Sequence, residues 1–129
     1  MGEKLINLSA KETDVMSVLW RENKDLTASQ IAQAGELKLN TVKVALPSLL
    51  KKGYVKVADI VYSRTVLSRS YRYSVSAEKY AAQQLKDMRN NTYSFSTLNF
   101  MEQFVKHDDR KDEILKELEE AIKKLKEED

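Results

Sequence analysis

The chain has 129 residues, 42% apolar and 33% charged, a length that suits one domain with an appendage. It contains no cysteine, and His107 is its one histidine, which excludes a disulfide scaffold, a cysteine nucleophile and an ordinary zinc site. Gly2, Gly35 and Gly53 lie too far apart for a phosphate-binding loop, and no apolar run approaches the roughly 20 residues of a membrane span. We expect a cytoplasmic protein that is not an enzyme and has no cofactor.

The basic residues are concentrated in one part of the chain. Residues 1–75 carry 12 Lys+Arg and 7 Asp+Glu, a net charge of +5, whereas residues 76–129 carry 10 and 13, a net charge of −3. Within residues 38–75 there are eight basic residues and one acidic residue, Asp59. Such a local excess is the electrostatic pattern expected for a polyanionic partner.

Two capping boxes predict the first two helices. Ser9 and Glu12 have the spacing of an N-cap and its N3 partner, ahead of an apolar helical repeat that should end near Asn23. Thr27 and Gln30 have the same spacing, and we expect the short helix that follows to be stopped by Gly35.

The third helix should start near Leu39 or Asn40 and end at Gly53, since apolar residues recur along one face up to that glycine. Pro47 conflicts with this pattern, because it has no N–H to donate to the carbonyl of Lys43. Either the helix kinks after Lys43 or it starts later. We favour the kink, because the apolar period continues across the proline.

Residues 54–61 and 69–75 are rich in β-branched and aromatic side chains and predict two strands, with residues 62–68 as the tip of the hairpin. Two short helices, a longer third helix and a two-stranded hairpin make a winged helix-turn-helix. The predicted fold class is mainly α with a small β-hairpin wing, followed by further helices.

The C-terminal part is predicted to be helical. A fourth helix should run from residue 76 or 77 to about 90, followed by a turn at 90–92 and an amphipathic stretch at 98–105; Asp108 or Asp109 should cap a last helix. We place the domain boundary between residues 76 and 77, with residues 1–76 as the winged helix and 77–129 as a dimerisation region. The candidate dimerisation residues are Leu98, Met101, Phe104, Val105, Ile114, Leu115, Leu118, Ile122 and Leu125. The alternative is that the last helix folds back on its own chain.

A recognition helix of this fold lies in the major groove with its N-terminal residues near base edges. By side-chain chemistry, Asn40 could read adenine, Lys43 guanine, and Thr41 a phosphate or a thymine methyl group. The candidate DNA-binding residues are Asn40, Thr41, Lys43, Val44, Lys51, Lys52, Arg64, Arg69 and Arg72. The alternative for the third helix is that its polar face is simply solvated. For Tyr71 and Tyr73, packing of the wing on the core is favoured over a role as stacking platforms.

A cluster of His107, Asp108, Asp109 and Asp112 could be considered as a cation site. We interpret it instead as a linker and a helix N-terminus, where the helix dipole favours carboxylates. No metal is therefore expected.

The sequence resembles the penicillinase and methicillin-resistance repressors, a family that also includes copper-transport repressors. The likeness lies in Ser9, Glu12, Val15-Met16 and Trp20, then in residues 39–53, and then in Tyr71-Arg72-Tyr73 followed by Val75-Ser76-Ala77-Glu78. It covers nearly the whole chain and is weakest over residues 91–95. It departs from the family at Thr13, Lys38 and Pro47 and in a longer wing, and without cysteine the chain cannot sense copper through thiolates.

This resemblance implies a dimeric winged-helix repressor that recognises DNA through Thr41 and Lys43 and dimerises through its C-terminal helices. It also implies a sensor-linked protease that cuts the bond between Asn99 and Phe100. We therefore predict a transcriptional repressor that occupies a palindromic double-stranded DNA operator as a homodimer. The alternative from another class is a winged helix used as a protein-interaction module without a specific DNA target.

Overall fold

The computed structural model describes residues 5–63 and 66–128, and Arg64 lies outside the described residues. The chain forms two compact units, of which the first ends at Gln84 and the second begins at Leu85. The division falls later than the predicted boundary at residue 76, because Tyr80 packs on the core of the first unit. The Tyr80 ring lies 5.7 Å from the ring of Trp20 and 5.9 Å from that of Tyr54.

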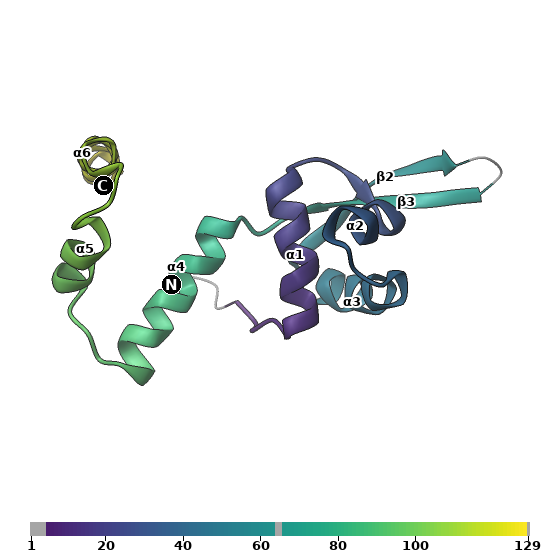
Figure 1. Ribbon diagram of the computed structural model, residues 1–129, viewed down its shortest axis with the longest axis horizontal. Coiled ribbons are helices and arrows are strands. Elements are labelled where there is room, and N and C mark those ends of the chain that lie inside the picture. The colour runs from purple at the N-terminus through teal and green to yellow at the C-terminus, as the bar shows by residue number, and fades with distance from the viewer. Residues whose placement is uncertain (1–4, 64–65, 129) are drawn as a thin grey trace. The chain divides into compact units, whose positions relative to one another are not determined.

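The first unit begins with helices α1 (Ala10–Glu22), α2 (Ala28–Gly35) and α3 (Leu39–Lys52) (Figure 1). Both predicted capping boxes are confirmed: the N-cap side chains of Ser9 and Thr27 each accept from the N3 backbone amide, and the N3 side chains bond back. Helix α1 ends with its C-cap at Asn23, as predicted, and Asn23 adopts the left-handed conformation.

Gly35 has a different role from the predicted helix stop. The residue that turns left-handed after α2 is Glu36, with φ of 53°, while Gly35 is still helical. A Cβ atom on Gly35 would lie 2.5 Å from Cγ2 of Val18 in α1. The glycine is therefore needed for the close approach of α2 to α1 and not for a positive φ.

Helix α3 is one continuous element from Leu39 to Lys52 with Pro47 inside it, so the later start considered for this helix is wrong. Its buried face consists of Val42, Ala45, Leu46 and Leu49. Gly53 ends the helix with φ of 81°, as predicted, and its amide bonds the carbonyls of Leu49 and Leu50.

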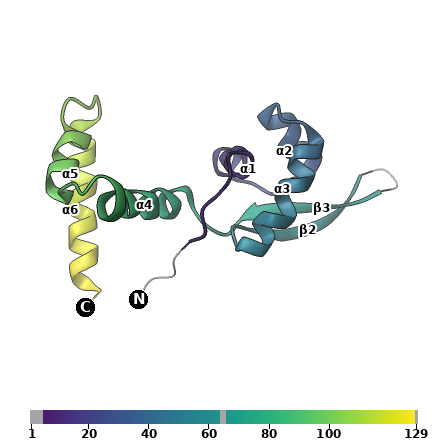
Figure 2. The ribbon, with the colours of Figure 1, turned by 90° about the horizontal axis from the view of Figure 1, so that it is seen from below.

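A small antiparallel sheet completes the first unit. The hairpin strands are β2 (Val55–Ser63) and β3 (Val66–Tyr73), and a short strand β1 (Leu26–Thr27), which was not predicted, pairs with β3 to give the order β1-β3-β2. The strands extend into the predicted tip, because Val61, Tyr62 and Ser63 pair with Ser68, Leu67 and Val66. The hairpin therefore projects beyond α2 and α3 (Figure 1 and Figure 2).

The core of the first unit lies between these helices and the base of the sheet. Fully buried side chains from α1, α2, α3 and the start of the hairpin form it: Val15, Met16, Leu19, Ile31, Val42, Leu49 and Tyr54. The indole N–H of Trp20 donates to the carbonyl of Val75 over 2.9 Å, which joins α1 to the segment after β3. Tyr71 and Tyr73 also pack against this core, as the packing alternative for them proposed.

The remaining helices are α4 (Ala77–Asp87), a π-helical segment η1 (Met88–Thr92), α5 (Thr97–Val105) and α6 (Lys111–Glu127). The predicted turn at residues 90–92 is wrong: this segment stays helical, and the amide of Tyr93 bonds the carbonyl of Met88 over 2.8 Å. Every helix within residues 5–63 and 66–128 is too short or too polar to cross a lipid bilayer.

The last helix also starts differently from the prediction. Its N-cap is Arg110, whose side chain makes no capping bond, whereas Asp108 or Asp109 was expected there. The carboxylate of Asp108 instead accepts from the amide of Arg110 over 2.7 Å, after a left-handed turn at His107 with φ of 64°. The Asp108 carboxylate thus stabilises the segment that leads into α6 and does not cap the first turn of α6.

Candidate nucleic-acid interface

The N-terminal half of α3 presents a polar face to solvent. Asn40, Lys43 and Val44 are exposed, and their spacing of three and four residues places them on one side of the helix. Thr41 is partly exposed at the edge of this face. Val44 is 67% exposed, although it is an apolar residue. The face thus offers an amide, an ammonium group and an apolar contact, which suit base edges in a major groove.

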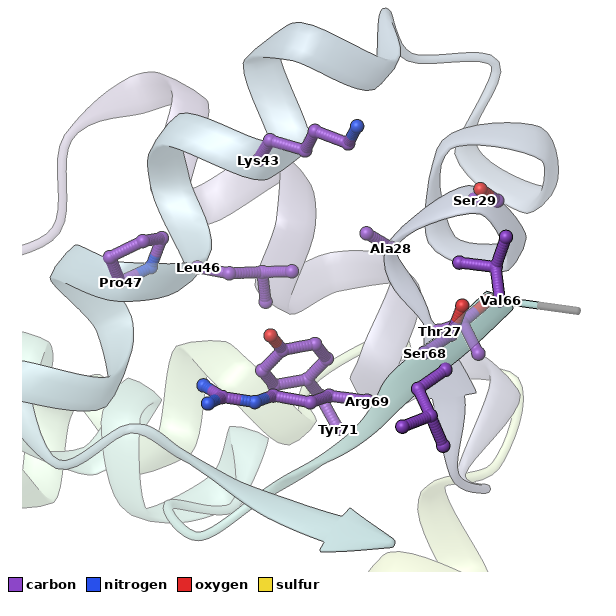
Figure 3. Close-up of a pocket in the computed structure, with 11 residues that line it drawn as sticks. Thr27, Ala28, Ser29, Lys43, Leu46, Pro47, Val66, Ser68, Arg69 and Tyr71 are labelled. Carbon is purple, nitrogen blue, oxygen red and sulfur yellow. The ribbon is translucent and has the colours of Figure 1, made fainter. Parts of the chain in front are cut away.

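Lys43 also borders an open hollow between α2, α3 and the wing (Figure 3). The hollow is lined by Thr27, Ala28 and Ser29 at the start of α2, by Lys43, Leu46 and Pro47 of α3, and by Val66, Leu67, Ser68, Arg69 and Tyr71 of β3. Lys43 and Arg69, 26 positions apart in sequence, supply its two cationic side chains. Two cations and several hydroxyl groups around one concave surface suit a phosphate backbone.

The hydroxyl groups of Thr27 and Ser29 were not among the predicted site residues. The capping box at the start of α2 was visible in the sequence, but its position beside the wing was not. That position depends on β1, which pairs with β3 through the register Leu26–Tyr71 and Thr27–Ser70. A strand of two residues leaves no periodic signal, so the sequence alone could not bring α2 and β3 together.

Lys52, a predicted DNA-binding residue, is bonded inside the protein. Its ammonium group lies 2.6 Å from Oε1 of Glu12 and 3.1 Å from the carbonyl of Asn7. Burial raises the pKa of the Glu12 carboxyl, but hydrogen bonds from Lys52, Ser48 and the Ser9 amide outweigh burial and lower that pKa to about 2. The positive charge of Lys52 is therefore compensated locally, while Lys51 beside it is exposed.

Arg72 is also held by neighbours within the first unit. Its guanidinium group donates to Asp25 over 3.4 Å and to Asn23 over 3.3 Å, and it lies 5.9 Å from the centre of the Tyr73 ring. These contacts direct Arg72 toward the loop between α1 and β1. Arg69 is exposed at the hollow instead, so these two predicted wing arginines have different surroundings.

The predicted dimerisation residues lie in α5 and α6. Met101, Val105, Leu115 and Leu118 line a shallow apolar hollow between the two helices, and Val105 is buried there. Others point into solvent in this single chain: Leu98, Phe104, Ile122 and Leu125 are each more than half exposed. The second unit thus buries part of the predicted seam and leaves an apolar surface uncovered.

The predicted cleavage site lies within α5. The Asn99 amide donates to the Ser96 N-cap hydroxyl over 3.2 Å, and the Phe100 ring is stacked 5.3 Å from Phe95 and 5.7 Å from Phe104. The bond between Asn99 and Phe100 is therefore part of a helical turn. A protease would need local unfolding of this turn before it could bind the backbone.

The basic α3 face, the adjacent wing and the helical second unit define the class of protein: a winged-helix DNA-binding transcriptional regulator. The sequence pattern of the penicillinase repressor family matches residues 8–124, and the chain belongs to this family. Its members are transcriptional regulators. A comparison with curated proteins found no match.

Solved structures that resemble the chain include regulators from Streptococcus pneumoniae, Neisseria meningitidis and Lactococcus lactis. FabT of Streptococcus pneumoniae, solved in complex with DNA, is 18% identical, with 99% of this chain and 82% of that one covered and a TM-score of 0.45. A MarR family regulator from Neisseria meningitidis is 19% identical, with coverage of 94% and 78% and a TM-score of 0.44. The zinc-responsive MarR family member ZitR of Lactococcus lactis is 16% identical, with coverage of 96% and 81% and a TM-score of 0.42.

Proposed function

We propose that this protein is a transcriptional repressor that binds a palindromic DNA operator as a homodimer. The observation that carries the proposal is the joint presence of Lys43 from α3 and Arg69 from the wing at one open hollow. In this arrangement α3 reads base edges in the major groove with Asn40, Lys43 and Val44, while Arg69 binds the adjacent phosphates. Bound at a promoter, such a dimer would block transcription by occupying the DNA.

The C-terminal unit supports the dimer part of the proposal. Ile122 and Leu125 of α6 are 52% and 63% exposed, and exposed apolar side chains gathered on one face mark an interaction surface. A second copy of the same chain offers the same face, which is the condition for a two-fold symmetric interface. Two recognition helices held by one dimer would read two half-sites together.

We also propose that a sensor-linked protease releases the operator by cutting between Asn99 and Phe100. A cut there would separate α6 from the DNA-binding unit, because α6 begins only at Lys111. The remaining fragment would keep α3 and the wing but lose the apolar face of α6. Each DNA-binding unit would then bind one half-site alone, without the avidity of the pair.

The experiment that tests the proposed function is selection of genomic fragments from the source organism by the purified full-length protein, followed by footprinting. The result we expect is one protected sequence with two inverted half-sites, and an affinity that falls steeply as salt is raised. Recovery of fragments without a common sequence, with affinity that barely changes with salt, would favour the protein-interaction module instead.

A further inference from the structure

The distal half of the wing carries large apolar side chains that are mostly exposed to solvent. Tyr62 is 76% exposed, Ile60 58% and Leu67 57%. Soluble proteins seldom leave a cluster of this kind on a projecting hairpin unless it binds something. The hairpin reaches beyond α2 and α3 (Figure 1 and Figure 2).

The strand register places these residues on one face. Directly opposite residues share a face of an antiparallel pair, and the register pairs Tyr62 with Leu67 and Ile60 with Arg69. The bulge between Val57 and Asp59 keeps this alternation in phase with Tyr71, which packs on the core at the base of the same face. The apolar strip is therefore an outward continuation of the face that carries the helices.

The strip is also continuous with the proposed DNA surface. Arg69, at its inner end, borders the hollow that contains Lys43 of α3. Among the described residues 60–63 and 66–69 of the wing, Arg69 is basic and none is acidic, so this part of the wing is electrostatically suited to a polyanion. DNA that contacts Lys43 and Arg69 would continue along the hairpin and meet Leu67 and Tyr62 next.

We propose that Tyr62 and Leu67 form an apolar wedge that enters the minor groove beside each half-site, opens a base step and bends the operator. Proteins that bind the minor groove commonly insert apolar side chains between base steps and kink the duplex by about 20–90°. The wedge would give sequence preference through deformability, with a flexible pyrimidine–purine step favoured where it enters. This inference rests on the proposed function, because it requires α3 to dock the wing on DNA.

The experiment uses full-length protein and the operator fragment that this protein itself selects. Bending is measured by energy transfer between dyes at the two duplex ends, and base unstacking by 2-aminopurine placed at steps flanking each half-site. The variants are Tyr62→Ser and Leu67→Ser, both at exposed positions that should leave thermal unfolding unchanged. The control is Ile6→Ser, because Ile6 is also an exposed apolar residue, at 57%, but it lies ahead of α1 and outside the wing.

We expect the wild type and Ile6→Ser to bend the duplex and to raise 2-aminopurine fluorescence at one flanking step. Tyr62→Ser and Leu67→Ser should lose both signals and bind about tenfold more weakly. Wild-type bending and affinity in both variants would overturn the wedge while leaving the proposed function standing. A wild type that selects no DNA would overturn both, and loss of self-association without a change in DNA binding would make the strip a protein interface.

Discussion

The ammonium group of Lys52 lies 2.6 Å from Oε1 of Glu12, and this contact joins the last turn of α3 to the first turn of α1. The Glu12 carboxylate also accepts from the Ser9 amide and the Ser48 hydroxyl, so each oxygen has a partner although the side chain is buried. The network fixes α3 on α1. It therefore determines where α3 points.

Breaking this pair should destabilise the first unit. Lys52→Met leaves the Glu12 carboxylate buried without its cation, at a cost of about 3 kcal/mol in the free energy of unfolding. Lys51→Met, at the exposed neighbouring position, is the matched control and should change it by less than about 0.5 kcal/mol. Denaturant unfolding measures both, and equal effects of the two substitutions would contradict a structural role for the pair.

The same carboxyl group should make stability depend on acid pH. Because the pKa of Glu12 is lowered to about 2 in the folded protein from 4.5, its contribution is fully present above about pH 4.5 and is lost as pH falls toward 2. Unfolding measured between pH 5 and about pH 2 should show this loss in the wild type. Glu12→Gln should flatten that part of the profile, and an unchanged profile would show that the carboxyl group does not carry it.

Gly35→Ala should destabilise the protein by about 1–3 kcal/mol, because the new Cβ would lie 2.5 Å from Val18 Cγ2. A second experiment places asparagine at each glycine and compares Gly35→Asn with Gly53→Asn. At Gly53 the obstacle is a φ of 81° with open space around the Cβ position, and asparagine tolerates that conformation. The thermal midpoint of Gly35→Asn should therefore fall much further than that of Gly53→Asn, and the reverse order would contradict the packing role of Gly35.

Much of this architecture follows from local sequence rules, and the parts that do not are tertiary. The capping boxes at Ser9 and Thr27 and the Gly53 stop depend on neighbours within a few residues, so the sequence predicted them. The pairing of Lys52 with Glu12 joins residues 40 positions apart, and no local pattern indicates it. The strand β1 is two residues long and forms only because β3 is there to pair with it.

Lys43→Ala should cost about 1–3 kcal/mol of operator binding and relax the preference at one base position. Lys51→Ala, at the other end of α3, is the control and should weaken binding without altering base preference. Selection of randomised operators by each variant measures the preference. If Lys43→Ala selects the wild-type sequence with the same stringency, α3 does not read DNA in the proposed orientation.

Arg69→Ala should weaken binding to all sequences alike and reduce the slope of log affinity against log salt by about one. Arg72→Ala should change that slope less, because Arg72 is already paired with Asp25. Anisotropy titrations over a series of salt concentrations measure the slope for both variants. A larger change for Arg72 than for Arg69 would mean that DNA meets the other face of the wing.

Replacing Leu118 and Ile122 by aspartate should dissociate the dimer, because the substitutions put charges into the apolar face of α6. Lys116→Asp, on the polar side of the same helix, should leave the dimer intact. Sedimentation analysis separates the two outcomes. A dimer that persists in the Leu118→Asp, Ile122→Asp variant would locate the interface elsewhere.

The proposed cleavage between Asn99 and Phe100 can be tested in cells of the source organism. Under inducing stress the mass of the chain should fall as transcription begins, and Asn99→Ala, at an exposed side chain, should slow both changes together. Derepression while the protein stays full length would exclude release by cleavage.

The spacing of half-sites tests most directly whether one dimer holds two recognition helices on one face of a DNA duplex. Fluorescence anisotropy compares the selected operator with the same operator carrying about 5 additional base pairs between its half-sites, which turns one half-site to the opposite side of the duplex. We expect the insertion to weaken binding by about 10²-fold and a further 5 base pairs to restore part of the loss. Affinity that is unchanged by the insertion would contradict joint recognition by a dimer.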